Sequence, residues 1–260
     1  MSIWQSLRVI AAAAIAAAVA AGPAEAQKQG GVLKIPHGDS PASMSILEES
    51  TIVAEGPMMA VFNNLVMFDQ HVAQNSISTI VPDLATSWAW GDDGKTLTFK
   101  LREGVKWHDG VPFTAADVKC TWDMLTGKSS EKLRVNPRKS WYRNLEEVTT
   151  NGDYEVTFHL KRPQPAFLAL LASGFSPVYP CHVASRDMRQ HPVGTGPFKF
   201  GEFKPNEYIK VKRNPHYWKK GRPYLDGIEY TIIRNLSTAV LAFVAGKFDM
   251  TFLFRHDFPI

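Results

Sequence analysis

The sequence predicts a mixed α/β (α+β) fold, in which strands and helices follow one another without strict alternation. Two six-residue segments, 96–101 and 155–160, alternate apolar and polar residues, which is typical of half-buried strands. Between them, Thr114 can cap a helix with its hydroxyl, and Asp117 completes an acidic variant of the capping box. The short spacing between apolar runs at 198–203 and 208–211 favours antiparallel pairing. Elements of both kinds in this order indicate a mixed sheet protein.

Turn residues and apolar runs place the other elements. Gly30-Gly31 precedes the first apolar run, and a loop of turn-forming residues follows it at 37–41. Asp92-Asp93-Gly94 supplies the turn before residue 96, and Gly246 ends the last helix. Further strands are expected at 32–35, 65–68, 198–203, 208–211, 228–233 and 250–254, and helices at 58–62, 114–125, 166–172 and 238–245.

Residues 1–26 have the order of regions found in a secretory signal peptide. Arg8 supplies the positive region, residues 9–21 form an unbroken apolar run, and Ala24-Glu25-Ala26 has the small residues of a cleavage site. A membrane anchor is the alternative, but about 13 apolar residues are too few to span roughly 30 Å of hydrocarbon. No cysteine follows the cleavage site, which argues against a lipoprotein. We expect a periplasmic protein that begins at Gln27 and is not inserted in the membrane.

Export leaves two interpretations open for the two cysteines, Cys120 and Cys181. In an oxidising compartment they can form a disulfide, which would close a loop of about 60 residues and contribute about 4 kcal/mol on the chain-entropy model. Alternatively, they are two unpaired thiols in the core. No CxxC pair or paired histidines accompany them, so no zinc site is expected.

Charge and motifs argue against several classes of function. The formal net charge is +4, but the basic residues are scattered, whereas proteins that bind nucleic acid usually present a clustered basic face. His108-Asp109-Gly110 has the composition of a catalytic dyad, yet Asp-Gly is typical of a turn. The segment 194–197 (GTGP) lacks the lysine and spacing of a phosphate-binding loop, and neither G-x-S-x-G nor H-E-x-x-H occurs. We therefore expect no enzyme activity, no cofactor and no metal.

Three blocks of sequence carry a resemblance to a known family. The first is 81–88 (VPDLATSW), the second runs from 93 to 118, and the third joins 194–198 (GTGPF) to 213–218 (RNPHYW). In this order they resemble the peptide/nickel family of extracellular solute-binding proteins, whose members bind oligopeptides, dipeptides or nickel chelates for ABC importers. The resemblance covers nearly the whole chain after residue 26, and most of its positions are architectural.

That resemblance implies a type II periplasmic-binding-protein clamshell, in which two lobes enclose the ligand. The first lobe would comprise 27–50 and 173–260, and residues 51–172 would form an inserted small domain. Family members are much longer than this chain, so the second lobe is expected to be largely missing. The ending at 255–260 does not resemble a natural C-terminus, which a truncated gene, a frameshift or an expression boundary would explain.

The resemblance also places three loops near the ligand. The candidate residues are Glu49, Ser50, Thr51, Arg138, Trp141, Ser173, Gly174 and Phe175. Trp141 is the strongest candidate, because an aromatic face suits stacking on a ligand. Each of the eight could instead be a solvated loop residue or a core aromatic. The acidic residue with which the family pairs a peptide's amino group belongs to the second lobe and has no counterpart here.

We therefore expect the solute-binding component of an ABC importer for peptides or related solutes, in truncated form, whose partners are the solute and the permease subunits of the inner membrane. The alternatives are an exported remnant that has no transport role or only contacts another subunit and, more remotely, a periplasmic hydrolase. The downstream gene sequence would separate the first two. Because a clamshell divides ligand contacts between two lobes, this chain alone should bind peptide no better than about millimolar. It should also expose apolar surface around Ile232, Phe243 and Phe252, and associate through it.

Overall fold

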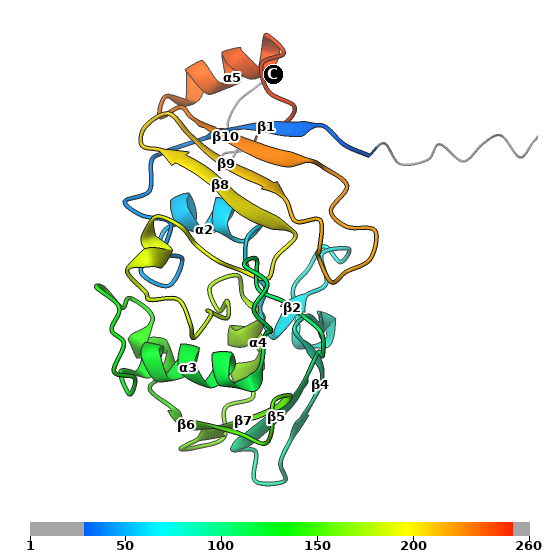
Figure 1. Cartoon of the computed structure of the whole chain (residues 1–260), viewed down its shortest axis with the longest axis vertical. Helices are drawn as coiled ribbons and strands as arrows, with labels where there is room; N and C mark the ends of the chain where they lie inside the picture. The colour runs from blue at the N-terminus through cyan, green and yellow to red at the C-terminus, as the bar shows by residue number, and fades with distance from the viewer. Residues whose placement is uncertain (1–28, 252–260) are drawn as a thin grey trace, which may run out of the picture. The chain divides into compact units, whose positions relative to one another are not determined.

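Two four-stranded sheets and a two-stranded sheet organise residues 29–251, which are the residues that the computed structural model describes (Figure 1). The mixed α/β class expected from the sequence is confirmed. The signal peptide predicted at 1–26, the residue Phe252 and the ending at 255–260 lie outside the described residues, as does most of the strand expected at 250–254.

The first sheet has the strand order β1-β10-β9-β8, from β1 (Val32–His37), β8 (Phe198–Lys204), β9 (Tyr208–Arg213) and β10 (Gly227–Ile232). Strands β8 and β9 pair antiparallel, as their spacing predicts; β10 also pairs antiparallel with β9, and β1 joins β10 in parallel. Ile35, Ile209 and Val211 are buried on one face. Helices α2 (Ile52–Met58) and α5 (Leu236–Val244) lie on opposite sides of this sheet (Figure 1).

The second sheet is antiparallel throughout, with the order β4-β5-β7-β6, from β4 (Ala85–Trp90), β5 (Thr96–Leu101), β6 (Leu145–Thr150) and β7 (Glu155–Leu160). The alternating residues of β5 and β7 place Leu97, Phe99 and Phe158 on a buried face. Helix α3 (Ala115–Thr126) covers that face, where the ring of Trp122 lies 5.0 Å from that of Phe158.

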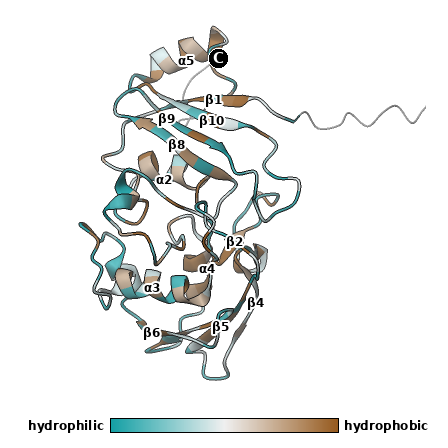
Figure 2. Cartoon of the chain, viewed as in Figure 1, coloured by the Kyte–Doolittle hydropathy of each residue, from teal (hydrophilic) through white to brown (hydrophobic). Residues whose placement is uncertain are grey.

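Short elements connect the two sheets. Strand β2 (Val66–Phe68) pairs with β3 (Ile80–Pro82). The short helical elements are the 3-10 turns η1 (Ile77–Thr79), η2 (Lys139–Tyr142) and η3 (Asp187–Arg189) and the helix α4 (Phe167–Ala172). Figure 2 shows that α4 and α5 are both mainly apolar; several α4 residues are buried, whereas α5 buries only Ala239. Every helix among residues 29–251 is too short or too polar to cross a lipid bilayer.

Helix boundaries follow the capping signals in one case and tertiary contacts in another. Thr114 caps α3 and Asp117 completes the capping box, as predicted. The helix expected at 58–62 is wrong, because α2 ends at Met58. The backbone oxygens of Ala60 and Val61 instead accept hydrogen bonds from Phe198 (3.0 Å) and Gly196 (2.9 Å), so this segment is held by the chain that leads into β8.

Candidate functional site

The side chain of Arg138 lies where the segments predicted to face a ligand come together. Its guanidinium donates to the backbone oxygen of Ile46 at 2.6 Å and to Oε2 of Glu55 at 3.0 Å, two residues that flank the predicted loop 49–51. The side chains of Arg138 and Glu55 are 0% and 1% exposed. The buried side chain of Arg138 therefore links η2 to α2. It was expected to contact a ligand, but it has no exposed surface and instead contacts the residues around it.

Trp141 and Phe175 form an aromatic pair over this buried cation. Their ring centroids are 5.8 Å apart in an edge-to-face arrangement. The guanidinium carbon of Arg138 lies 5.9 Å from the Trp141 ring and 5.3 Å from the Phe175 ring, within the range of cation–π attraction. Trp141 is 42% exposed although it is a large aromatic residue. The fold thus brings together two of the predicted residues, a tryptophan from η2 and a phenylalanine that follows α4.

The exposed apolar surface continues onto helix α2. Ile52 begins α2, and Met59 directly follows its last residue. Glu55 turns inward to Arg138, whereas Ile52 and Met59 are 54% and 50% exposed. A Cβ atom on Gly174 would lie 2.7 Å from Cε of Met59, so the absence of a side chain at residue 174 lets Met59 pack against this loop.

A cavity of about 500 Å³ adjoins this surface. Ser173, Gly174 and Phe175 form part of its wall, together with Met59 and Asn64. The side-chain amide of Asn64 donates to the backbone oxygen of Ser173 at 2.6 Å, which fixes the loop at the cavity. The predicted segment 173–175 therefore lines a cavity and also contributes to the aromatic surface.

Glu49, Ser50 and Thr51 lie at the opposite end of α2 from Met59, about 12 Å along the helix. The backbone oxygen of Thr51 accepts hydrogen bonds from Ala54 (3.2 Å) and Glu55 (3.1 Å), which begins the helix. Oε1 of Glu49 accepts from the hydroxyl of Ser43 at 2.9 Å. This loop borders the helix that carries Ile52, and it is not part of the cavity wall.

The polar end of the cavity is formed by residues that the sequence prediction missed. They are Asn63, Asp83, Tyr217 and Lys219. Asp83 and Tyr217 belong to two of the blocks that were assigned to architecture. The sequence signal for them is weak, because an aspartate before a strand and a lysine after Tyr-Trp are common in loops.

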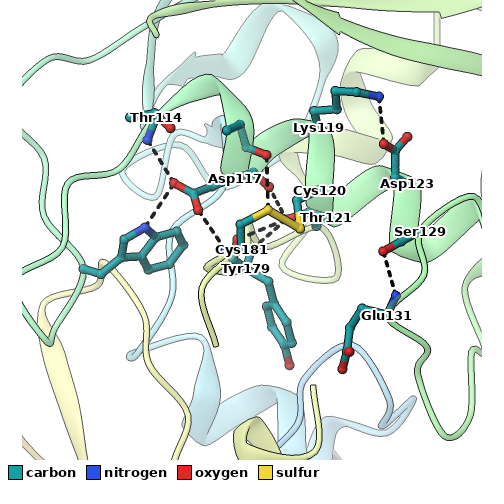
Figure 3. Close-up of a disulfide and its surroundings, with 12 residues drawn as sticks. Thr114, Asp117, Lys119, Cys120, Thr121, Asp123, Ser129, Glu131, Tyr179 and Cys181 are labelled. Atoms are coloured by element: carbon teal, nitrogen blue, oxygen red, sulfur yellow. Dashed lines mark hydrogen bonds and ion pairs between the residues drawn. A yellow bond between two sulfur atoms is a disulfide. The ribbon is translucent and has the colours of Figure 1, made fainter. Parts of the chain in front are cut away.

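A disulfide between Cys120 and Cys181 joins helix α3 to the segment that follows Phe175 (Figure 3). The two Cα atoms are 5.8 Å apart. Beside it, Oδ1 of Asp117 accepts from the backbone amide of Cys181 at 2.8 Å, and Oγ1 of Thr121 accepts from the amide of Tyr179 at 2.9 Å. The chain from Phe175 to residue 181 is thereby attached to α3.

His108 serves as a structural link. Its Nδ1 accepts from the amide of Gly194 at 3.2 Å and its Nε2 lies 3.0 Å from the backbone oxygen of Gly196, so the proton belongs on Nε2. Burial lowers the pKa of His108 to about 4, which keeps the ring neutral. Asp109 pairs instead with His182, with 2.6 Å between Oδ2 and Nε2. Among residues 29–251, no group of three or more His, Cys, Asp or Glu side chains could hold a metal ion.

Comparisons with known proteins agree with one another. The model of bacterial extracellular solute-binding proteins, family 5 Middle, matches residues 79–259. The chain is 27% identical over 234 residues to the glutathione-binding protein GsiB of Escherichia coli, and the aligned region covers 82% of this chain and 45% of that protein. It is 29% identical over 237 residues to di/tripeptide-binding protein 1 of Pseudomonas aeruginosa, with 83% and 42% covered.

Solved structures extend the likeness to the fold. The ABC transporter-associated periplasmic binding protein DppA of Helicobacter pylori, solved in complex with the peptide STSA, superimposes with a TM-score of 0.76 at 28% identity. The match covers 86% of this chain and 47% of that one. The chain thus spans less than half the length of these relatives.

Proposed function

Because the chain belongs to the bacterial extracellular solute-binding proteins of family 5, we propose that it binds a peptide or a related small solute for an ABC importer. The observation that carries this proposal is an aromatic pair, the exposed Trp141 and the partly buried Phe175, beside a cavity of about 500 Å³. Cavities of roughly 300–1,000 Å³ are typical of small-ligand sites. The relatives described above are binding proteins for glutathione and for short peptides.

In the proposed mode, the aromatic surface and the cavity recognise different parts of the solute. Trp141, Ile52 and Met59 offer apolar contact for side chains of the ligand. The cavity wall also carries the side-chain amides of Gln70 and Asn75, which match the donors and acceptors of peptide groups, whereas those of Asn63 and Asn64 donate within the protein. Arg138 supports the aromatic pair from below without touching the ligand. Binding needs no covalent step and no cofactor.

We also propose the family's division of the chain. The sheet of β1 and β8–β10 would belong to the first lobe, 27–50 and 173–260, and the sheet of β4–β7 to the inserted small domain, 51–172. Export through the predicted signal peptide and delivery to permease subunits are part of the same proposal. The likeness to binding proteins along most of the chain favours it over a hydrolase.

Titration of the isotopically labelled chain with trialanine, followed by amide chemical shifts into the millimolar range, tests the proposal. We expect saturable shifts at Trp141 and at residues 173–175. Trp141→Ala should weaken binding several-fold, because a stacking surface is lost. Val135→Ala is a matched control, since Val135 is also an exposed apolar residue (52%) and lies in the connection between α3 and η2, a few residues before Trp141. Absence of saturable shifts would favour the alternative of an exported remnant.

A further inference from the structure

The charged end of the cavity has an unusual distribution of hydrogen bonds. Asp83, Tyr217 and Lys219 are the ionisable residues of its wall. Oδ1 of Asp83 accepts from Nζ of Lys219 at 2.6 Å, and Oδ2 accepts from the side chain of Asn63 at 2.9 Å and from the amide of Asn64 at 3.2 Å. The Asp83 side chain is only 3% exposed. Both of its oxygens are therefore engaged, and it has little capacity to bind a further group.

Lys219, in contrast, has donors to spare. Its side chain is 34% exposed, and among the described residues its hydrogen-bond acceptors are Asp83 and, at 3.8 Å, Sδ of Met67. A thioether is a weak acceptor, whereas an ammonium group carries three strong donors. A ligand oxygen at this position would be a much better partner than sulfur.

Tyr217 offers a second donor beside the first. Its hydroxyl oxygen accepts from the side chain of Asn63 at 3.3 Å, the same amide group that donates to Asp83. Among the described residues, no acceptor for the Tyr217 hydroxyl proton is found. Burial raises the pKa of Tyr217 far above neutrality, so the hydroxyl keeps that proton. The Lys219 ammonium and the Tyr217 hydroxyl thus lie on either side of the Asn63–Asp83 hydrogen bond.

Positive charge prevails around these two donors. The guanidinium of Arg102 lies 4.6 Å from the ring of Trp218, on which the ammonium of Lys219 also packs at 4.8 Å. Nε of Arg102 also donates to the backbone oxygen of Asp83 at 3.3 Å, so two cations adjoin one carboxylate, which is already paired with Lys219. A second carboxylate would restore the balance of charge, whereas an ammonium group would be repelled.

We propose that this end of the cavity binds a carboxylate of the solute, with Lys219 and Tyr217 as the two donors. The inference rests on the proposed function and adds a preference to it: acidic solutes, or peptides bound through a free carboxyl end, should bind in preference to neutral ones. Lys219 and Tyr217 would then determine specificity, whereas Trp141 would supply affinity without regard to charge.

The test compares trialanine with trialanine amide, which differ only in the carboxylate. With the labelled full chain, we expect the free acid to bind about tenfold more tightly, the effect of one charged hydrogen bond. Lys219→Met should abolish this preference, and Tyr217→Phe, which leaves the ring and the Asn63–Asp83 bond in place, should reduce it several-fold. Lys210→Met is the matched control, because Lys210 lies on β9 and pairs with Glu229; it should keep the preference.

Acetate and acetamide provide an arm that does not depend on peptide binding. Acetate should produce saturable shifts at residues 217–219 that acetamide does not, and Lys219→Met should remove them. Equal binding of the two peptides would overturn the carboxylate site and leave the proposed function standing. If neither peptide binds, the proposed function fails, and acetate decides the site alone. If Lys219→Met does not fold, an unchanged preference in Tyr217→Phe overturns the two-donor site.

Discussion

Arg138 donates a 3.0 Å hydrogen bond to Glu55 in an ion pair that is hidden from solvent beneath Trp141 and Phe175. Nε of Arg138 and Oε1 of Glu55 have no hydrogen-bond partner among the described residues. Taking a guanidinium and a carboxyl group out of water is costly, which is why burial raises the pKa of Glu55, and a pair with unsatisfied atoms recovers that cost only in part. A gain in stability alone therefore does not account for the pair, which also positions the rings of Trp141 and Phe175.

Arg138→Met should destabilise the fold strongly. The substitution leaves the Glu55 carboxyl buried without its partner, and breaking such a pair costs about 3–5 kcal/mol. Urea denaturation should show this loss in the free energy of unfolding. Arg134→Met is the control, because the Arg134 side chain is 51% exposed, and it should change stability by no more than about 0.5 kcal/mol. A loss below about 1 kcal/mol for Arg138→Met would show that the pair holds little of the structure together.

His108 should make stability depend on pH between 6.5 and about 4. Its pKa is lowered by burial from 6.5 to about 4. A lowered pKa contributes stability that is complete above pH 6.5 and is lost as the pH falls toward 4, about 3 kcal/mol in all. Glu55 acts oppositely: burial raises its pKa from 4.5 to about 8 although Arg138 opposes the rise, so its contribution is lost as the pH rises from 4.5 through 8.

Unfolding measurements on variants separate the contribution of His108 to the pH dependence from that of Glu55. The free-energy gap between wild type and His108→Gln should be largest at pH 7 and should shrink toward pH 4.5, as measured by urea denaturation at several pH values. His71→Gln, at an exposed histidine, is the control. A gap of constant size for His108→Gln would mean that the His108 ring does not titrate as proposed.

Gly194 and Gly174 should respond differently to the same substitution. A Cβ atom on Gly194 would lie 1.9 Å from the backbone oxygen of Val61, which cannot move away without displacing the chain. On Gly174 it would meet the flexible end of Met59. We expect Gly194→Ala to cost about 3 kcal/mol or more, and Gly174→Ala less than about 1 kcal/mol. Urea denaturation of both variants checks this, and equal costs would contradict it.

The Cys120–Cys181 disulfide should be formed in exported protein. Thiol titration of denatured, non-reduced material should find no free thiol. Replacing both cysteines with serine should lower the free energy of unfolding by about 4 kcal/mol, because the cysteines are 61 residues apart in the chain. Two free thiols in protein recovered from the periplasm would contradict the pairing.

The chain alone should associate through helix α5. Leu241 and Val244 are 69% and 76% exposed, and Phe243, which the sequence places on an apolar surface, is 38% exposed. Sedimentation velocity should reveal concentration-dependent association that Leu241→Glu together with Val244→Glu removes. Val72→Glu, at a 43% exposed residue elsewhere, should leave it unchanged. A wild-type chain that stays monomeric at all concentrations would refute this role of α5.

In the second sheet, the central strands β5 and β7 could be predicted from the sequence, and the edge strands β4 and β6 could not. In β5 and β7 the alternation is clear because Leu97, Phe99 and Phe158 pack against α3. In β4, at the edge of the same sheet, a register shift between Ala85 and Ser87 interrupts the alternation, so that Thr86 and Ser87 are both exposed. Local pattern therefore identifies an element only where packing constrains every second residue.

The site is less predictable, because its contacts join residues that are far apart in sequence. Trp141 and the loop 173–175 could be named from the family resemblance, but the partners of Arg138 lie 92 and 83 residues away from it. The Asp83–Lys219 pair spans 136 residues. No short motif records such a pairing, so the burial of Arg138 and the donors of the cavity appear only in the folded chain.

The bond between the two sulfur atoms makes residues 120–181 a closed covalent ring, and that ring carries Arg138, Trp141 and the loop 173–175. Its most accessible stretch is 127–135, between α3 and η2. A protease that cuts once within this stretch would open the ring without releasing a fragment. The nicked protein would keep its full mass until a reductant was added, so the aromatic pair would stay tethered on both sides to the rest of the chain.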